Sequence, residues 1–318
     1  MHIAVAAPPS AARVIGALLL SIVGISCAAP IVRLSHSPPL TITIWRMFFS
    51  LLLVGLALVW TGQWREWRAV SPRLLGWSLL AGSLLAVHFW SWSASLGYTS
   101  VAASVVLVSL QPILVLPIAD RWLGERATSA QRGGVILAVV GAIVVALGDG
   151  FGGLLGGVSS RRALFGDLLA AVGGVAGAGY FLIGRRVRPH LSLWSYVGVL
   201  YGACLLVLLA AAAVSSEAIW PVTPRELLLF AGLAVGPMLF GHTILNWALG
   251  HAPAHLVNVA VLGEPVGATL LAWVLPAIRE QPPLGALVGG AIVVAGLALA
   301  SARPKSRSAS TARSGSTG

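Results

Sequence analysis

Charged residues are scarce in this sequence. Only 9% of its 318 residues are Asp, Glu, Lys or Arg, whereas 58% are hydrophobic and the mean hydropathy is +0.92. Because a soluble domain carries about 25% charged residues, this composition excludes a soluble globular protein and predicts an integral membrane protein with the lipid bilayer around it. The net charge of +11 does not indicate a nucleic-acid partner, since the basic residues lie in short loops between apolar runs.

Cysteines and enzyme motifs are scarce as well. The two cysteines, Cys27 and Cys204, lie inside apolar runs, so no disulfide framework is expected. The sequence has no His-Glu-x-x-His, no Walker A motif and no Gly-x-Ser-x-Gly. Residues 148–153 spell Gly-x-Gly-x-x-Gly, but they follow a membrane helix and not a strand, so they predict no dinucleotide site. We therefore expect no enzyme, no cofactor and no metal.

Apolar runs of about membrane-spanning length dominate the chain, and they predict an all-α membrane protein with ten transmembrane helices. The first run leads straight into more runs, so it is interpreted as a retained helix and not a signal peptide. The Ser/Arg-rich tail 301–318 is predicted to be disordered. The runs are residues 14–31, 40–60, 75–95, 101–118, 134–147, 164–183, 193–214, 227–249, 254–275 and 284–300.

The basic residues predict the orientation of the chain. With the N-terminus inside, the cytoplasmic segments hold fourteen Lys and Arg residues and the opposite side holds five; Arg46 is left out because it lies inside a run. Positively charged loops stay in the cytoplasm. We therefore predict a multi-pass protein of the cell inner membrane with both termini cytoplasmic.

An internal repeat divides the chain into two halves of five runs each. Because five is odd, the second half must enter the membrane upside down relative to the first, as in many secondary transporters. The predicted parts are the first repeat 1–147, a Gly-rich linker 148–163, the second repeat 164–300 and the tail. The matching residues are Leu96, Gly97 and Pro112 with Leu249, Gly250 and Pro265 (offset 153); Glu125, Gly134 and Gly141 with Glu280, Gly289 and Gly296 (offset 155); and Gly16 and Gly24 with Gly166 and Gly174 (offset 150).

Short motifs in a fixed order carry a family resemblance. They are IWRM at 44–47, SL at 95–96, YTSVA at 98–102, QP at 111–112, LGER at 123–126, GDLLA at 166–170 and LGEPV at 262–266. With them the chain resembles the EamA-type ten-helix transporters of the drug/metabolite transporter superfamily. The resemblance implies two inverted five-helix repeats and transport by alternating access, but it does not supply the substrate. Two departures are Arg279, where the family commonly has Gly, and Gly97, where an acidic residue is frequent.

Glu264 and Pro265 are the most informative pair in the sequence. A carboxylate inside a membrane helix costs about 2.5–3.5 kcal/mol and needs a partner, a proton or a cavity. Pro265 breaks the helix, and its repeat mate Pro112 indicates that this break belongs to the architecture. Glu264 has only the neutral Gln111 opposite it. It is interpreted as a proton carrier or cation partner, or as a carboxyl that caps the carbonyls freed by Pro265.

Arg46 is the second charge inside an apolar run. It could bind a substrate carboxylate, pair with Glu264 or extend to the membrane surface. Trp45 is its neighbour and a further candidate, although consecutive helical residues point about 100° apart.

Polar residues on the third, fourth and eighth runs complete the candidate site. His88 and Trp92 are four residues apart and share a helix face, as do His242 and Asn246 on the equivalent run. Each pair either lines a cavity or is packed between helices. Ser100, Ser104 and Gln111 follow one stripe that either lines a pathway or joins helices by hydrogen bonds. Asn258 is not expected to share the face of Glu264, being about 120° away.

The sequence therefore predicts a permease or exporter of a small-molecule metabolite. Without an ATP-binding motif, concentrative transport must use ion or substrate gradients. Two alternatives stay open: a translocase for a lipid or lipid-linked sugar, and a non-transporting membrane assembly partner. A stripe of small residues predicts close helix packing or a homodimer contact; it consists of Gly134, Ala138, Gly141 and Gly148 with Gly289 and Gly296.

Overall fold

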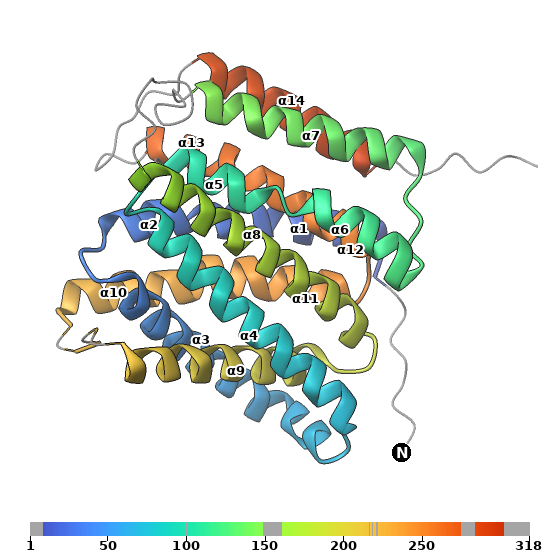
Figure 1. The fold of residues 1–318 in the computed structure, drawn as a ribbon. Helices are drawn as coiled ribbons and strands as arrows, with labels where there is room; N and C mark the ends of the chain where they lie inside the picture. Colours follow the sequence, from blue (N-terminus) through green and yellow to red (C-terminus); the bar gives the residue numbers. More distant parts are fainter. Residues whose placement is uncertain are drawn as a thin grey trace, which may run out of the picture.

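The computed structural model describes residues 9–99, 101–148, 161–215, 217, 219–220, 222–274 and 284–301, and these residues form a helical bundle without strands (Figure 1). Most of the linker 148–163, the tail beyond 301 and Glu280 lie outside the described residues. In chain order the helices are α1 (Ala11–Ser26), α2 (Ala28–Leu34), α3 (Pro39–Thr61), η1 (Gln63–Arg68), α4 (Pro72–Ser95), α5 (Val101–Ser109), α6 (Pro112–Ile118), η2 (Ala119–Leu123), α7 (Ser129–Gly148), α8 (Arg161–Val187), α9 (Leu193–Val214), α10 (Pro224–Leu233), η3 (Ala234–Thr243), α11 (Ile244–Leu249), α12 (Ala254–Ala260), η4 (Val261–Gly263), α13 (Glu264–Val274) and α14 (Leu284–Ala300).

Eight segments in the described part of the chain are long and apolar enough to cross a membrane. Two further apolar helices, Ser129–Val144 and Leu287–Ala300, are shorter. The all-helical membrane fold is therefore confirmed, and the fifth and tenth predicted spans stay predictions. The eight segments are Ala11–Leu34, Pro39–Thr61, Pro72–Ser95, Ser104–Leu123, Leu164–Val187, Leu193–Val214, Pro224–Leu249 and Ala254–Leu271.

Capped helix starts fix where two of the long helices begin. The Ser71 hydroxyl accepts a hydrogen bond from Leu74 N at 3.3 Å at the start of α4. The Thr223 hydroxyl accepts one from Glu226 N at 3.3 Å at the start of α10. In both helices a proline follows the cap, where its missing N–H has no helical partner to lose.

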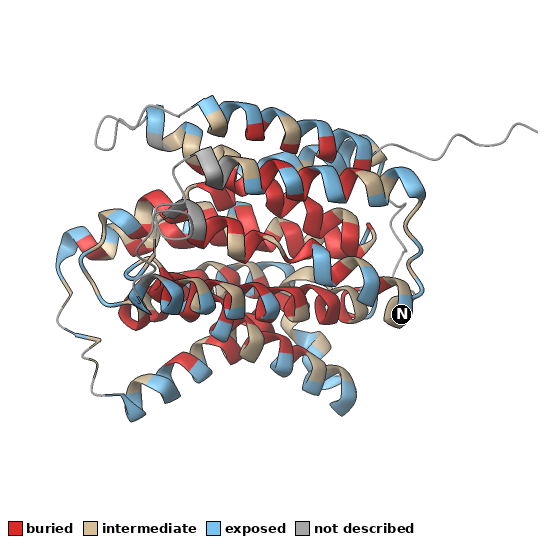
Figure 2. Ribbon diagram, turned by 45° about the horizontal axis from the view of Figure 1, so that its top comes forward, coloured by how far each residue is buried: buried red, intermediate tan, exposed pale blue. Residues whose placement is uncertain are grey.

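Two helices are interrupted at the prolines that the sequence singled out. α5 ends at Ser109 and α6 starts at Pro112, and the three-residue 3-10 turn η4 separates α12 from α13 directly before Glu264. Proline removes one backbone donor and crowds the preceding turn, so a continuous α-helix cannot form there. The predicted break at Glu264–Pro265 is confirmed. Gln111 and residues 261–263 are buried, and buried residues fill the interior of the bundle (Figure 2).

The helices α7 and α14 form a separate pair along one side of the bundle (Figure 1). A Cβ atom added at Gly134 would lie 2.4 Å from Ala300 N, and one added at Gly296 would lie 2.5 Å from Ala138 N. Only glycine allows two backbones to approach this closely. The small-residue stripe therefore packs α7 on α14 within one chain, and a homodimer stays a prediction.

This close packing predicts opposite effects at adjacent glycines. Gly134→Ala should lower the free energy of unfolding by about 1–3 kcal/mol, because the added methyl group forces α14 away. Gly133→Ala is the matched control: its Cβ would meet only Leu299 Cδ2 at 3.9 Å, so the better helix former should leave stability unchanged or raise it by up to about 1 kcal/mol. Thermal melting of both variants in detergent measures this difference, and equal melting temperatures would contradict the packing.

Candidate functional site

A small buried cavity lies where the two interrupted helices meet α1, α2, α3, α4, α8, η3 and α11. Its volume is about 20 Å³, which is room for roughly one water molecule. Six of the nine predicted site residues line it: Arg46, His88, Trp92, Gln111, His242 and Glu264. The apolar part of the lining consists of Ile25, Ala28, Phe89, Val108, Phe181, Leu245 and Val261.

Arg46 places a positive charge in this cavity. The residue is only 1% exposed, and its guanidinium carbon lies 4.0 Å from the centre of the Phe89 ring. Its Nε and Nη2 atoms are buried and have no hydrogen-bond partner in the described part of the protein. The side chain therefore does not extend to the membrane surface. It holds unused hydrogen-bond donors inside the bundle, where an unpaired donor is costly.

Glu264 places a carboxyl group in the same cavity. It is 9% exposed and stands in the first turn of α13, where the positive end of the helix dipole favours a carboxylate. No ion pair within 4.0 Å joins it to Arg46, and its carboxylate has no hydrogen bond to any described residue. The guanidinium and the carboxyl group thus share one cavity without direct contact, and the carboxyl group does not cap carbonyls freed by Pro265.

The two histidines come together across the cavity, with ring centres 6.1 Å apart. His88 Nδ1 lies 2.8 Å from Gly173 O, and His242 Nδ1 lies 3.4 Å from the Tyr180 hydroxyl. Asn246 lies behind His242 and does not line the cavity; its Nδ2 donates to the Tyr180 hydroxyl at 3.1 Å. Both pairs, His88 with Trp92 and His242 with Asn246, therefore face the interior of the bundle. Helix α8 supplies the hydrogen-bond partners of both histidine rings.

A hydrogen bond between Gln111 and Asn258 connects the first helix interruption with α12, which directly precedes the second. Asn258 Nδ2 donates to Gln111 Oε1 at 3.1 Å. A Cβ atom at Gly177 would lie 2.8 Å from Gln111 Nε2, so the glycine leaves the space that this amide occupies. The sequence did not single out Asn258, because an unbroken helix would turn it away from Glu264. Asn258 does not line the cavity itself, but it binds Gln111, which does.

Trp45 and Ser104 lie away from the cavity. Trp45 Nε1 donates to Ile219 O at 3.1 Å, and its ring lies 5.7 Å from that of Trp220. Its position one residue from Arg46 turns it to another helix face. Ser104 Oγ lies 2.5 Å from Ser95 Oγ. This contact joins two helices, so Ser104 fits the packing role rather than the pathway.

A buried polar network ties helices together at one end of the bundle. Glu125 accepts hydrogen bonds from Arg185 Nε at 2.5 Å and from Ala254 N at 2.7 Å. Arg188 Nε donates to Asn246 O at 2.9 Å and Nη1 donates to Leu191 O. Burial lowers the pKa of the Arg188 guanidinium to about 10, so it stays charged at neutral pH. This end therefore holds α8, α11 and α12 together.

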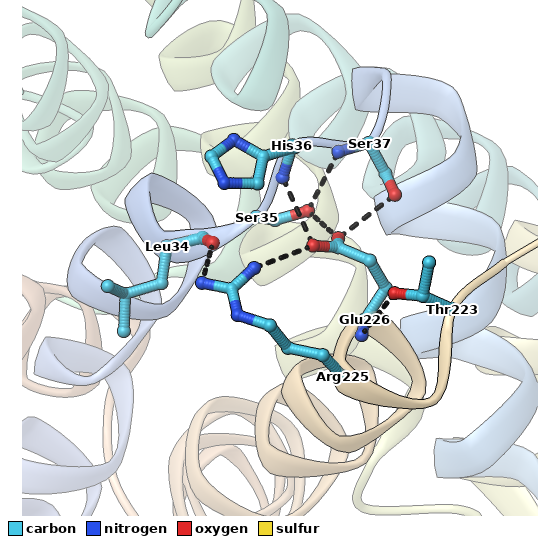
Figure 3. A network of polar contacts seen from close by, with 7 residues as sticks. All are labelled: Leu34, Ser35, His36, Ser37, Thr223, Arg225 and Glu226. Atoms are coloured by element: carbon cyan, nitrogen blue, oxygen red, sulfur yellow. Dashed lines mark hydrogen bonds and ion pairs between the residues drawn. The ribbon is translucent and has the colours of Figure 1, made fainter.

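A second network closes the start of α10 at the other end (Figure 3). The Glu226 carboxylate accepts hydrogen bonds from the Ser35 hydroxyl, from His36 N at 3.2 Å and from the Ser37 hydroxyl at 2.9 Å. Arg225 Nη1 lies 3.1 Å from the same carboxylate, and its Nη2 donates to Leu34 O at 2.8 Å. The loop between α2 and α3 is therefore fastened to α10.

Comparison with known proteins identifies the family. Residues 12–147 and 164–302 match the EamA-like transporter family. The chain belongs to this family. Membership in a transporter family confirms the resemblance that the sequence motifs carried, and it agrees with the apolar helices of a multi-pass membrane protein.

The individual relatives share less than a third of their residues with this chain in the matched regions. A probable terminal-alkyne amino-acid exporter of Streptantibioticus cattleyicolor is 29% identical over 210 residues, which are 64% of this chain and 64% of that exporter, slightly less than two thirds of its length. An uncharacterized transporter of Archaeoglobus fulgidus is 25% identical over 83% of this chain and 96% of its own length. A solved crystal structure with 22% identity matches 92% of this chain and 97% of its own, with a TM-score of 0.70. That likeness shows the fold.

The placement of two opposite charges in one cavity predicts energetic coupling between them. At a pH at which Glu264 is ionised, Glu264→Gln should destabilise the protein, because it leaves the Arg46 charge buried without a compensating negative charge. The double variant Arg46→Met with Glu264→Gln removes both charges and should recover the lost stability. A double-mutant cycle on melting temperatures should give a coupling energy of about 0.5–3 kcal/mol.

The exposed Arg33 on α2 provides the control for this cycle. Arg33→Met removes a charge of the same kind outside the cavity and should not couple to Glu264→Gln. Strictly additive effects of Arg46→Met and Glu264→Gln would show that the two cavity charges do not interact.

Proposed function

We propose that this protein is a secondary transporter that exports small zwitterionic metabolites of the amino-acid class by alternating access. One observation carries this proposal: Arg46 and Glu264 line the same cavity without touching each other. A zwitterion carries a carboxylate for the arginine and an ammonium group for the glutamate. A cargo of this kind would form an ion pair with both side chains at once.

The hydrogen-bonding groups of the cavity support the same cargo. Arg46 Nε, Arg46 Nη2 and Trp92 Nε1 are buried donors without partners among the described residues. An arginine fork matches a carboxylate in two parallel hydrogen bonds. The Glu264 carboxylate supplies an acceptor for an ammonium group. The name of the Streptantibioticus cattleyicolor relative, a probable amino-acid exporter, agrees with this class and with export.

The size of the cavity requires movement. A volume of about 20 Å³ holds one water molecule and no amino acid. The described conformation is therefore contracted around the site. Transport would require the helices to separate at one end at a time, and the Glu125 and Glu226 networks lie at two such ends. Release of one network while the other stays formed is the movement that alternating access needs.

Helix contacts support the proposed inverted repeats with halves 1–147 and 164–300 and ten transmembrane helices. The third predicted span packs on the sixth as α4 on α8, and the eighth packs on the first as η3 on α1. If each span is replaced by its equivalent in the other half, the pair of third and sixth spans becomes the pair of eighth and first spans. The second span packs on the seventh as α3 on α9, and the fifth on the tenth as α7 on α14. Each of these two pairs joins equivalent spans, so the replacement leaves it unchanged. A pseudo-twofold axis would produce this pattern of contacts.

Labelling of single cysteines tests the proposed orientation in the inner membrane. In a background without Cys27 and Cys204, a membrane-impermeant maleimide added to intact cells should react with Ser215→Cys and not with Arg68→Cys, although both positions are exposed. Arg68 lies in a loop predicted to be cytoplasmic. Permeabilised cells provide the control, because both cysteines should then react. Reaction of Arg68→Cys in intact cells would reverse the orientation.

Glu264 is the proposed coupling group, since it is the carboxylate that lines the cavity. In proteoliposomes, Glu264→Gln should abolish the pH-dependent part of amino-acid flux, because glutamine cannot exchange a proton. The control is Asp120→Asn on the surface of η2, which should keep the wild-type pH profile. An unchanged flux and pH profile in Glu264→Gln would disprove the coupling role.

The polar cavity also bears on the two alternatives. An assembly partner has no need of buried donors and opposite charges without partners, since a packed apolar interior would be more stable. A lipid or lipid-linked sugar translocase requires a lateral opening towards the bilayer. Counterflow of labelled amino acids, compared with stimulation by added lipid, separates that translocase from a metabolite exporter.

A further inference from the structure

His88 and His242 occupy related positions in the proposed repeats, yet their environments differ. Both rings line the cavity, and both bind to α8 through Nδ1. Gly173 and Tyr180, their partners on α8, are seven residues apart and lie on about the same face of that helix. Because each Nδ1 is directed to α8, each Nε2 is turned away from it. Neither Nε2 has a hydrogen-bond partner within the described ranges.

The partner of His88 decides where its proton lies. Gly173 O lies 2.8 Å from His88 Nδ1, and a carbonyl oxygen only accepts hydrogen bonds. Nδ1 therefore carries the proton. A second proton on the ring would add a positive charge beside Arg46 in a region of low dielectric constant. His88 is accordingly neutral, and its Nε2 is a hydrogen-bond acceptor.

The partners of His242 lead to the opposite tautomer. Asn246 Nδ2 donates to His242 O at 2.8 Å, which fixes the orientation of the amide, and the same nitrogen donates to the Tyr180 hydroxyl at 3.1 Å. The Tyr180 oxygen is thus an acceptor for Asn246, and its proton is left for His242 Nδ1 at 3.4 Å. His242 Nδ1 therefore accepts, and the ring carries its proton on Nε2.

We propose that His88 and His242 form a fixed acceptor–donor pair that binds a hydroxyl group of the transported molecule. This inference rests on the proposed function. A hydroxyl group donates one hydrogen bond and accepts others, so one oxygen between the rings can accept from His242 Nε2–H and donate to His88 Nε2. A methyl group in the same place can do neither. The pair therefore selects a hydroxylated cargo over its apolar isostere.

Transport of isosteric amino acids measures this selection. In counterflow with proteoliposomes, the wild-type protein should prefer threonine over valine and serine over alanine by about ten-fold or more in kcat/KM. Sites built to bind a hydroxyl group discriminate strongly against analogues that lack it, because their polar groups are left unpaired. If threonine is transported as well as valine, and serine as well as alanine, the acceptor–donor pair is overturned while the proposed function stands. Transport of none of the four amino acids overturns the proposed function and this inference with it.

Tyr180 is a positioning residue in this arrangement, since it acts through His242 and does not line the cavity. Tyr180→Phe keeps the ring and removes the proton donor that fixes the His242 tautomer. It should reduce the threonine-to-valine transport ratio several-fold, because only threonine uses the fixed donor. Tyr201→Phe is the matched control: Tyr201 is equally buried, and its hydroxyl lies 3.0 Å from Thr243 Oγ1 instead. The threonine-to-valine transport ratio of Tyr201→Phe should equal that of the wild type.

Nitrogen NMR tests the tautomers without transport. In full-length protein labelled with ¹⁵N-histidine in lipid nanodiscs, signals assigned through His88→Gln and His242→Gln should show Nδ1–H for His88 and Nε2–H for His242. Tyr180→Phe should change the His242 signals, and Tyr201→Phe should not. Detection of the same tautomer at both histidines would overturn the acceptor–donor pair even if the protein proves to transport amino acids.

Discussion

The buried guanidinium of Arg46 is the constraint on which the rest of this site depends. An arginine that is 1% exposed has lost its hydration, and the penalty for a buried ion is several kcal/mol. The contact with the Phe89 ring at 4.0 Å contributes about 2 kcal/mol, less than this penalty. The residual cost explains why the same cavity holds Glu264. It also explains why a cargo with its own carboxylate would bind favourably there.

Interrupted helices make room for these polar groups. A continuous helix uses its backbone groups internally and presents only side chains, whereas the breaks at 110–111 and 261–263 expose backbone and change the helical phase. The Asn258–Gln111 hydrogen bond connects the first break with α12, the helix that leads into the second. The prolines that interrupt the helices therefore belong to the scaffold, and the side chains beside them belong to the site.

The sequence predicts this fold and part of the site for a simple physical reason. Ionisable residues are so costly inside apolar helices that Arg46, His88, His242 and Glu264 stand out without a structure, and all four line the cavity. Tyr180 lies inside an apolar run and carries no comparable signal. The contacts of Glu226 were also beyond prediction, because they join residues about 190 positions apart, a proximity that only the packing of the helices produces.

The proposed repeats are alike in scaffold and unlike in chemistry. Pro112 and Pro265 interrupt equivalent helices, but Gln111 stands opposite Glu264, and the two histidines have different partners on α8. Two identical halves would surround the cavity with the same groups on both sides and would suit a symmetric ligand. A cargo with a carboxylate at one end and an ammonium group at the other requires unlike sides. The divergence of the side chains is what the proposed cargo would require, and the shared helix breaks are what the proposed movement would require.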